Sequence, residues 1–126
     1  MPNLTESDLA HCTGTEQWYR HWMNRHFLFT DGIKTMADKG EAYWLIDAIF
    51  SHQSNPKLRT ERLQYFQLWQ LKVNADKTAV LTCRGDSSEP VLVEQKIEFT
   101  DFPLDEIKLY AEGDGEHLIL LLPSEH

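Results

Sequence analysis

Residues 41–52 are apolar on almost every side when wound as a helix, and this constrains the fold more than any other part of the chain. One set of apolar residues recurs at helical spacing, and a second set covers much of the remaining surface. The first set is Ala42, Leu45, Ile46, Ile49 and Phe50, and the second is Tyr43, Trp44 and Ala48. Such a helix is buried on more than one side. The sequence therefore predicts a central helix that begins after Gly40 and ends before Asn55-Pro56.

The second half of the chain has the period of β-strands. Apolar and polar residues alternate over residues 65–73, 78–84, 91–99 and 117–122, with turn residues between these runs. Residues 104–111 fit either a helix or a strand. We interpret them as a strand because the hairpin turn Gly113-Asp114-Gly115 follows.

The part of the chain before the central helix is interpreted as mainly helical. Residues 13–16 have the spacing of a capping box, and the helix they begin is predicted to reach about His26 with Trp18 and Trp22 on one face. Residues 27–29 are predicted to form an edge strand. These elements predict one α+β domain over residues 1–126. Its N-terminal helices pack on one face of a C-terminal antiparallel β-meander of about five strands.

Charge is distributed unevenly along the 126 residues, whose formal net charge is −8. Residues 1–62 contain seven Lys/Arg and eight Asp/Glu, whereas residues 63–126 contain five and twelve. Nucleic acids and anionic membranes attract clustered Lys and Arg, so neither is expected as a partner. A solvated surface is the simpler interpretation of the acidic half, and the alternative is an acidic sheet face that meets a basic protein.

Composition also bears on the compartment. No apolar run reaches the roughly 18 residues of a membrane span, and the N-terminus lacks the basic start and apolar core of a signal peptide. Cys12 and Cys83 lie far apart and match no disulfide framework. The sequence therefore predicts a cytoplasmic protein with reduced thiols.

The motif search finds no catalytic or metal-binding set. A zinc site would draw on His11, Cys12, His21, His26 and Cys83, whose spacing does not give the two close ligand pairs of a structural site. Cys83 falls on the inward face of its strand, which favours a core thiol over a nucleophile. No metal and no cofactor are predicted.

Asp47 is the polar residue that most needs an explanation, because it lies in the middle of the apolar helix. It either pairs with a cation at the helix edge or is held by hydrogen bonds from a backbone amide or a Trp N–H, since an unpaired buried charge costs too much. His52 lies five residues further on and does not share its helix face, so a direct dyad is not expected. Asp31 is interpreted as a helix cap.

Five segments resemble an uncharacterised family of small bacterial domains that also occurs on plasmids and phage-like elements. They are Gly14-Thr15, Phe29-Thr30-Asp31-Gly32, residues 43–49, Phe66-Gln67-Leu68-Trp69 and Thr100-Asp101-Phe102-Pro103. The resemblance covers nearly the whole chain. It implies no activity, cofactor or catalytic residue, and it draws attention, as structural or binding residues, to Asp31, Trp44, Asp47, Asp101 and Phe102.

The leading hypothesis is a small non-enzymatic protein that acts by binding, such as an accessory or inhibitor of a mobile element, with Glu94 and Glu98 on its contact face. The alternative is a small-molecule-binding domain or hydrolase. Its pocket would lie between the aromatic helices and the sheet, with Asp31, Asp47 or His52 as polar groups. A third hypothesis is a homodimer that pairs through residues 27–29 or through the last strand.

Overall fold

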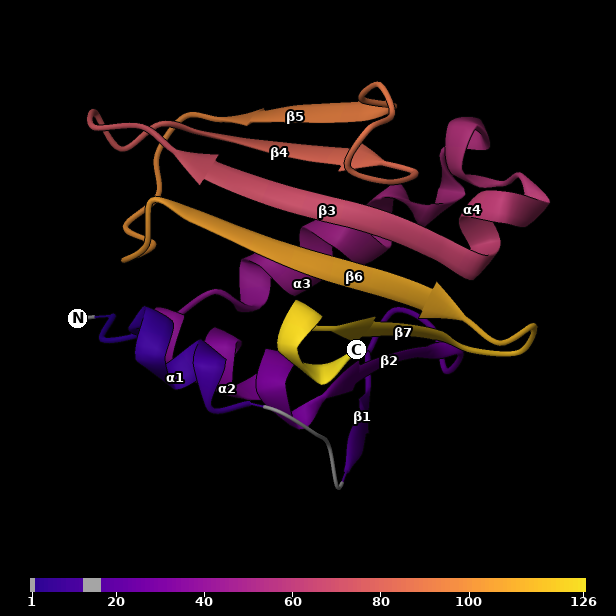
Figure 1. Ribbon diagram of the computed structural model, residues 1–126, viewed down its shortest axis with the longest axis horizontal. Coiled ribbons are helices and arrows are strands. Elements are labelled where there is room, and N and C mark those ends of the chain that lie inside the picture. The colour runs from indigo at the N-terminus through magenta and orange to yellow at the C-terminus, as the bar shows by residue number, and fades with distance from the viewer. Residues whose placement is uncertain (1, 13–16) are drawn as a thin grey trace.

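The computed structural model describes residues 2–12 and 17–126. The predicted helix start at residues 13–16 lies outside the described residues. Most helical residues lie in the first half of the chain, and one short 3₁₀ turn lies at the C-terminus (Figure 1). The α-helices are α1 (Glu6–Ala10), α2 (Asp31–Gly40), α3 (Tyr43–Ser51) and α4 (Glu61–Tyr65), and the 3₁₀ turns are η1 (His52–Ser54), η2 (Pro56–Leu58) and η3 (Pro123–Glu125).

The strands of the described residues form one sheet of seven, in the order β1-β2-β7-β6-β3-β4-β5. β2 and β7 pair in parallel, and every other neighbouring pair is antiparallel. The strands are β1 (Trp18–Arg20), β2 (Phe27–Thr30), β3 (Phe66–Val73), β4 (Ala79–Arg84), β5 (Val93–Ile97), β6 (Glu106–Gly113) and β7 (Leu118–Leu121).

The α+β class and the central helix are confirmed, but the predicted five-stranded meander is wrong. Two strands, β1 and β2, precede α2, so the helices are not all N-terminal to the sheet. β6 pairs with β3 and not with its predecessor β5. Its interpretation as a strand is confirmed.

The predicted helix up to His26 is also wrong, because residues 18–20 form β1. Tyr19 stacks on Phe29 of the neighbouring strand with ring centroids 5.5 Å apart, and His21 N–H donates to Phe27 O at 2.8 Å. Aromatic residues favour a pleated surface when a neighbouring strand is present to pack against. This pairing with β2 overrides the helical spacing. It leaves the Trp18 and Trp22 side chains 60% and 76% exposed.

The core lies between α3 and the inner face of the sheet. In Figure 1, α3 passes behind the strands, and the C-terminal turn lies on the viewer's side of β6 and β7. Leu45, Ile49 and Trp69 are fully buried in this layer. The alternation of β3 and β4 places their inward residues against the helix and their outward residues on the open face.

A buried pair of glutamines joins the helical layer to the central strand. The Gln53 and Gln67 amides donate to each other's Oε1 atoms at 2.9 and 2.8 Å, and Trp69 Nε1 donates to Gln67 Oε1 at 2.9 Å. Each Nε2 also donates to a backbone carbonyl, Gln53 to Ile49 and Gln67 to Leu63. Buried amides are tolerated when they are hydrogen-bonded, and this network meets that condition.

The C-terminal turn caps α2. Glu125 Oε1 accepts a 2.7 Å hydrogen bond from Thr30 Oγ1, and Oε2 accepts a 3.1 Å bond from Gly32 N–H. Thr30 Oγ1 in turn accepts from Ile33 N–H, so Thr30 is the N-cap and the interpretation of Asp31 as the cap is wrong; Asp31 is the first residue of α2. A carboxylate is stabilised at the positive end of a helix. A Cβ on Gly32 would lie 2.4 Å from Glu125 Oε1, so glycine leaves room for this contact.

Replacing Gln67 with Leu should lower the free energy of unfolding by about 2–3 kcal/mol, because it leaves Trp69 Nε1 and Gln53 Oε1 buried without partners. Gln70→Leu, on the open face of the same strand, is the matched control and should change stability by less than about 0.5 kcal/mol. Urea unfolding followed by circular dichroism measures both. Equal stability of Gln67→Leu and the wild type would contradict this role for the network.

Candidate functional site

Asp47 on α3 is held by two side chains from the turn that follows β1. Its Oδ1 accepts hydrogen bonds from His21 Nε2 at 2.7 Å and from Trp22 Nε1 at 3.1 Å. The His21 side chain is 4% exposed and the Asp47 side chain is 43% exposed. The half-exposed carboxylate therefore lies at the rim of the core, and the buried imidazole fixes it there. The Trp N–H is a donor that the sequence interpretation proposed for Asp47.

The protonation of His21 follows from its two partners. Met23 N–H donates to His21 Nδ1 at 3.3 Å, so Nδ1 is the acceptor in the neutral ring. Nε2 then carries the proton and donates it to Asp47. The ring also packs against Phe50, with centroids 4.8 Å apart.

A carboxylate that orients a histidine is also found in hydrolytic triads, where the second ring nitrogen activates a nucleophile. Here His21 Nδ1 is bonded to a backbone N–H. Among the described residues, no Ser, Thr or Cys side chain is hydrogen-bonded to this ring. The hydrogen bonds of His21 and Trp22 to Asp47 hold an exposed indole against α3.

The other residues predicted for a site lie apart from this cluster. His52 Nε2 is paired with Gln95 Oε1 at 2.7 Å and its ring stacks on Trp69. Asp31 begins α2 and accepts from Gln17 N–H at 3.2 Å. Trp44 is half-buried against the core.

The acidic candidates lie at the opposite end of the sheet. Glu94 is on edge strand β5, and Glu98 and Asp101 follow it in the connection to β6. All three are exposed, whereas Phe102 is buried against Gly40. No hydrogen bond or ion pair among the described residues joins these carboxylates to Asp47.

The strand register does not give the acidic sheet face that the charge count predicted. Cations and carboxylates are interspersed on the open face of β3 to β6, and Lys72 faces Glu106 directly. The cations there are Lys72, Arg84, Lys96 and Lys108, and the carboxylates are Glu94, Glu106 and Glu112. The remaining acidic residues of the second half lie outside the strands, in turns, connections and η3.

The tryptophan side chains do not gather around one space between the helices and the sheet. Trp69 is fully buried there, and Trp18 and Trp22 are exposed. Five of the surface pockets in the described residues have volumes of about 200–390 Å³, and tryptophan lines none of the five. The sequence interpretation placed Trp18 and Trp22 inside because it assigned them to a helix.

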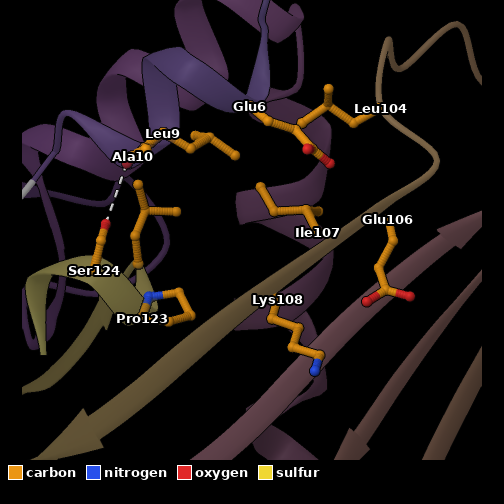
Figure 2. Close-up of a pocket in the computed structure, with 10 residues that line it drawn as sticks. Glu6, Leu9, Ala10, Leu104, Glu106, Ile107, Lys108, Pro123 and Ser124 are labelled. Carbon is orange, nitrogen blue, oxygen red and sulfur yellow. Dashed lines mark hydrogen bonds between the residues drawn. The ribbon is translucent and has the colours of Figure 1, made fainter.

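A groove of about 370 Å³ opens elsewhere, between α1, the start of β6 and η3; we call it the α1–η3 groove. Leu9, Ile107 and Pro123 provide apolar walls. Figure 2 shows Glu6 of α1 on one wall and Glu106 and Lys108 of β6 on the other. Ser124 joins the walls by donating to Leu9 O at 3.2 Å and to Cys12 O at 2.6 Å.

Comparison with known proteins places the chain in a family. Residues 3–126 match the family of unknown function DUF6876, and the chain belongs to that family. No curated protein and no solved structure matches it significantly. The resemblance to an uncharacterised domain family is thus confirmed. In the described residues, every helix is too short or too polar to cross a membrane.

Replacing Asp47 with Ala should lower the free energy of unfolding by about 1–2 kcal/mol, because His21 Nε2–H is left buried without an acceptor. Asp47→Asn keeps an oxygen acceptor and should lower the free energy of unfolding by less than Asp47→Ala does. Urea unfolding measures the stability. Time-resolved fluorescence anisotropy of variants in which Trp22 is the only Trp that emits should show faster indole motion in Asp47→Ala. A wild-type value in both measurements would contradict the anchoring role.

Cys83 should be inert, because burial raises its pKa from an ordinary value of 9.0 to about 12. The folded protein retains this thiol proton between pH 9 and 12, whereas the unfolded chain loses it. The contribution of Cys83 to stability is therefore fully present below pH 9 and declines as the pH rises toward 12. A thiol reagent at pH 8 should label Cys83 only after denaturation, with Cys83→Ser as the control. Rapid labelling of the native protein would contradict its burial.

Proposed function

We propose that this protein is a non-enzymatic binding domain that docks an extended segment of another protein along β1, with Trp18 and Trp22 as anchors. We call this surface the tryptophan edge; it consists of Trp18, Arg20 and Trp22. The observation that carries the proposal is the Trp22 side chain, which is 76% exposed and nevertheless hydrogen-bonded to Asp47.

β1 offers a free backbone edge. It pairs only with β2 among the described strands. His21 and Phe27 form a hydrogen-bonded pair, so the antiparallel pattern makes Tyr19 and Phe29 the next such pair. The N–H and C=O groups of Trp18 and Arg20 then point away from the sheet. An incoming strand can use these groups in β-augmentation.

The two indoles supply the side-chain part of the contact. Exposed Trp is uncommon on a protein surface, and Trp is enriched among the residues that dominate binding energies. Trp22 is held by Asp47, which is itself held by buried His21. A side chain that is already fixed loses less entropy on binding, which raises affinity. This gives the cluster around Asp47 a functional purpose besides its contribution to stability.

The partner that fits is a basic segment with apolar side chains in alternate positions. The net charge of −8 attracts a cationic partner and increases its rate of encounter. The exposed carboxylate of Asp47 beside the Trp22 indole favours Lys or Arg next to the apolar anchor. A carboxylate-rich segment would be repelled.

Selection of random peptides against the purified protein, followed by affinity measurement, tests the proposal. Selected peptides should be basic with apolar residues in alternate positions. Trp22→Ala should weaken the binding of these peptides by about tenfold or more. Phe99→Ala is the matched control, since Phe99 is 70% exposed near the far edge of the sheet. A backbone N-methyl group on the peptide position facing Arg20 should also reduce binding.

Three outcomes would contradict the proposal. Peptides could bind Trp22→Ala and Trp18→Ala as tightly as the wild type. Glu94→Lys and Glu98→Lys could weaken peptide binding, which would place the contact on the acidic residues instead. Light scattering could show a dimer that Trp18→Ala dissolves, which would make a second copy the occupant of the edge.

Small-molecule binding in the α1–η3 groove is the second candidate. The observation that favours it is a concave site of about 370 Å³ with apolar walls and three charged residues, Glu6, Glu106 and Lys108. Such a combination is typical of ligand pockets. Selected ligands whose affinity depends on Leu9 or Lys108, and not on Trp22, would support this candidate over the tryptophan edge.

A further inference from the structure

Two histidines from opposite ends of the chain meet at the start of the parallel strand pair. Phe27 of β2 lies beside Leu118 of β7, and Leu118 N–H donates to His26 O at 2.9 Å. The preceding residues, His26 and His117, are therefore neighbours as well. Their ring centroids are 6.0 Å apart.

The turn that joins β6 to β7 adds a carboxylate to this pair. Asp114 Oδ1 accepts from Glu116 N–H at 2.9 Å and from His117 N–H at 2.6 Å, which fixes the turn. Gly115 supplies the positive φ of 92° that this turn requires. Glu116 and His117 are thereby presented toward His26.

We propose that His26, Glu116 and His117 form a binding site for a divalent transition-metal ion, specifically Zn²⁺. One ligand atom from each of the three side chains lies within 4.8 Å of the other two. Tetrahedral zinc with ligand distances of about 2.0–2.1 Å separates its ligand atoms by about 3.3 Å. Closing this difference requires rotation of the exposed Glu116 side chain and of the half-buried imidazoles. Two imidazoles and one carboxylate suit zinc better than calcium or magnesium.

His26 carries an independent sign of a missing ligand. Its Nδ1 atom is buried and has no hydrogen-bond partner in the described residues. Nε2 is contacted by Arg25 Nε at 3.4 Å, which is long for a hydrogen bond. A buried polar nitrogen without a partner is unfavourable, and a metal ion bound to Nδ1 would remove that cost.

His117 has a carboxylate beside one of its ring nitrogens. Its Nδ1 lies 3.6 Å from Asp114 Oδ2, which is longer than a hydrogen bond. A carboxylate that bonds one imidazole nitrogen directs the other nitrogen to the metal and makes it a better ligand. Asp114 fixes the turn through Oδ1 and lies close enough to take this second role if the ring and the carboxylate approach each other on metal binding.

Three protein ligands leave a fourth position of the ion open. A pocket of about 390 Å³ is lined by the three proposed ligands together with Phe27, Gln64, Gly115 and Leu118. A second pocket of about 360 Å³ shares Phe27, Gln64 and Leu118 and extends the space toward Arg59. A water or an anionic ligand could occupy the open position, as in zinc sites with three protein ligands.

Titration of the untagged, metal-free full chain with ZnCl₂, followed calorimetrically, tests the site. The wild type should bind one equivalent. His117→Gln and Glu116→Gln should each weaken binding by about tenfold or more, because each removes a ligand from an exposed turn. His126→Gln is the matched control, since His126 is paired with Glu112 elsewhere and should leave binding unchanged.

A second readout separates this site from loose surface binding. Co²⁺ in place of Zn²⁺ should give the visible absorption bands of tetrahedral coordination in the wild type and in His126→Gln, but not in His117→Gln. Zn²⁺ should also raise the melting temperature of the wild type more than that of Glu116→Gln. Absence of stoichiometric binding, or equal binding by the wild type and both ligand variants, would overturn the proposal. Circular dichroism of each variant checks that it is folded.

Discussion

The parallel pairing of β2 with β7 is the contact on which the rest of the structure depends. It joins Phe27 to Leu118 and so places the last strand inside the sheet, between β2 and β6. With β7 in that position, β1 becomes the edge, and Glu125 of η3 reaches the N-terminus of α2. The predicted homodimer edges at residues 27–29 and at the last strand are both internal for the same reason. A parallel pair needs a long connection, and nearly the whole domain serves as that connection.

Two polar clusters perform different tasks at the rim and in the middle of the core. Gln53 and Gln67 are reciprocally bonded inside the core, and they fix the position of the helical layer on β3. Asp47 is half-exposed, and its partners His21 and Trp22 come from the turn that follows β1. A satisfied buried network specifies one packing arrangement. A network that reaches solvent can also hold a side chain ready for contact.

The proposed zinc site and the tryptophan edge lie on the same short segment. Trp22 and His26 belong to the connection between β1 and β2, and the segment is tied down by Asp47 on one side and by Leu118 on the other.

The amino-acid sequence by itself determined the central helix, the alternating strands and the inward position of Cys83, because burial leaves a local period that can be read from neighbouring residues. The position of Asp47 in an apolar helix also indicated that a Trp N–H was one possible hydrogen-bond donor to its carboxylate. Only the tertiary structure decided that residues 18–20 form a strand, that Trp22 is the donor, and that His26 meets His117. The strand depends on pairing with the neighbouring β2, whose energy exceeds the local helical preference around Trp18, and the other two contacts join segments far apart in the chain. The charge count likewise gave the acidic total of the second half, whereas the strand register decided that its cations gather on the sheet face and most carboxylates lie in the connections.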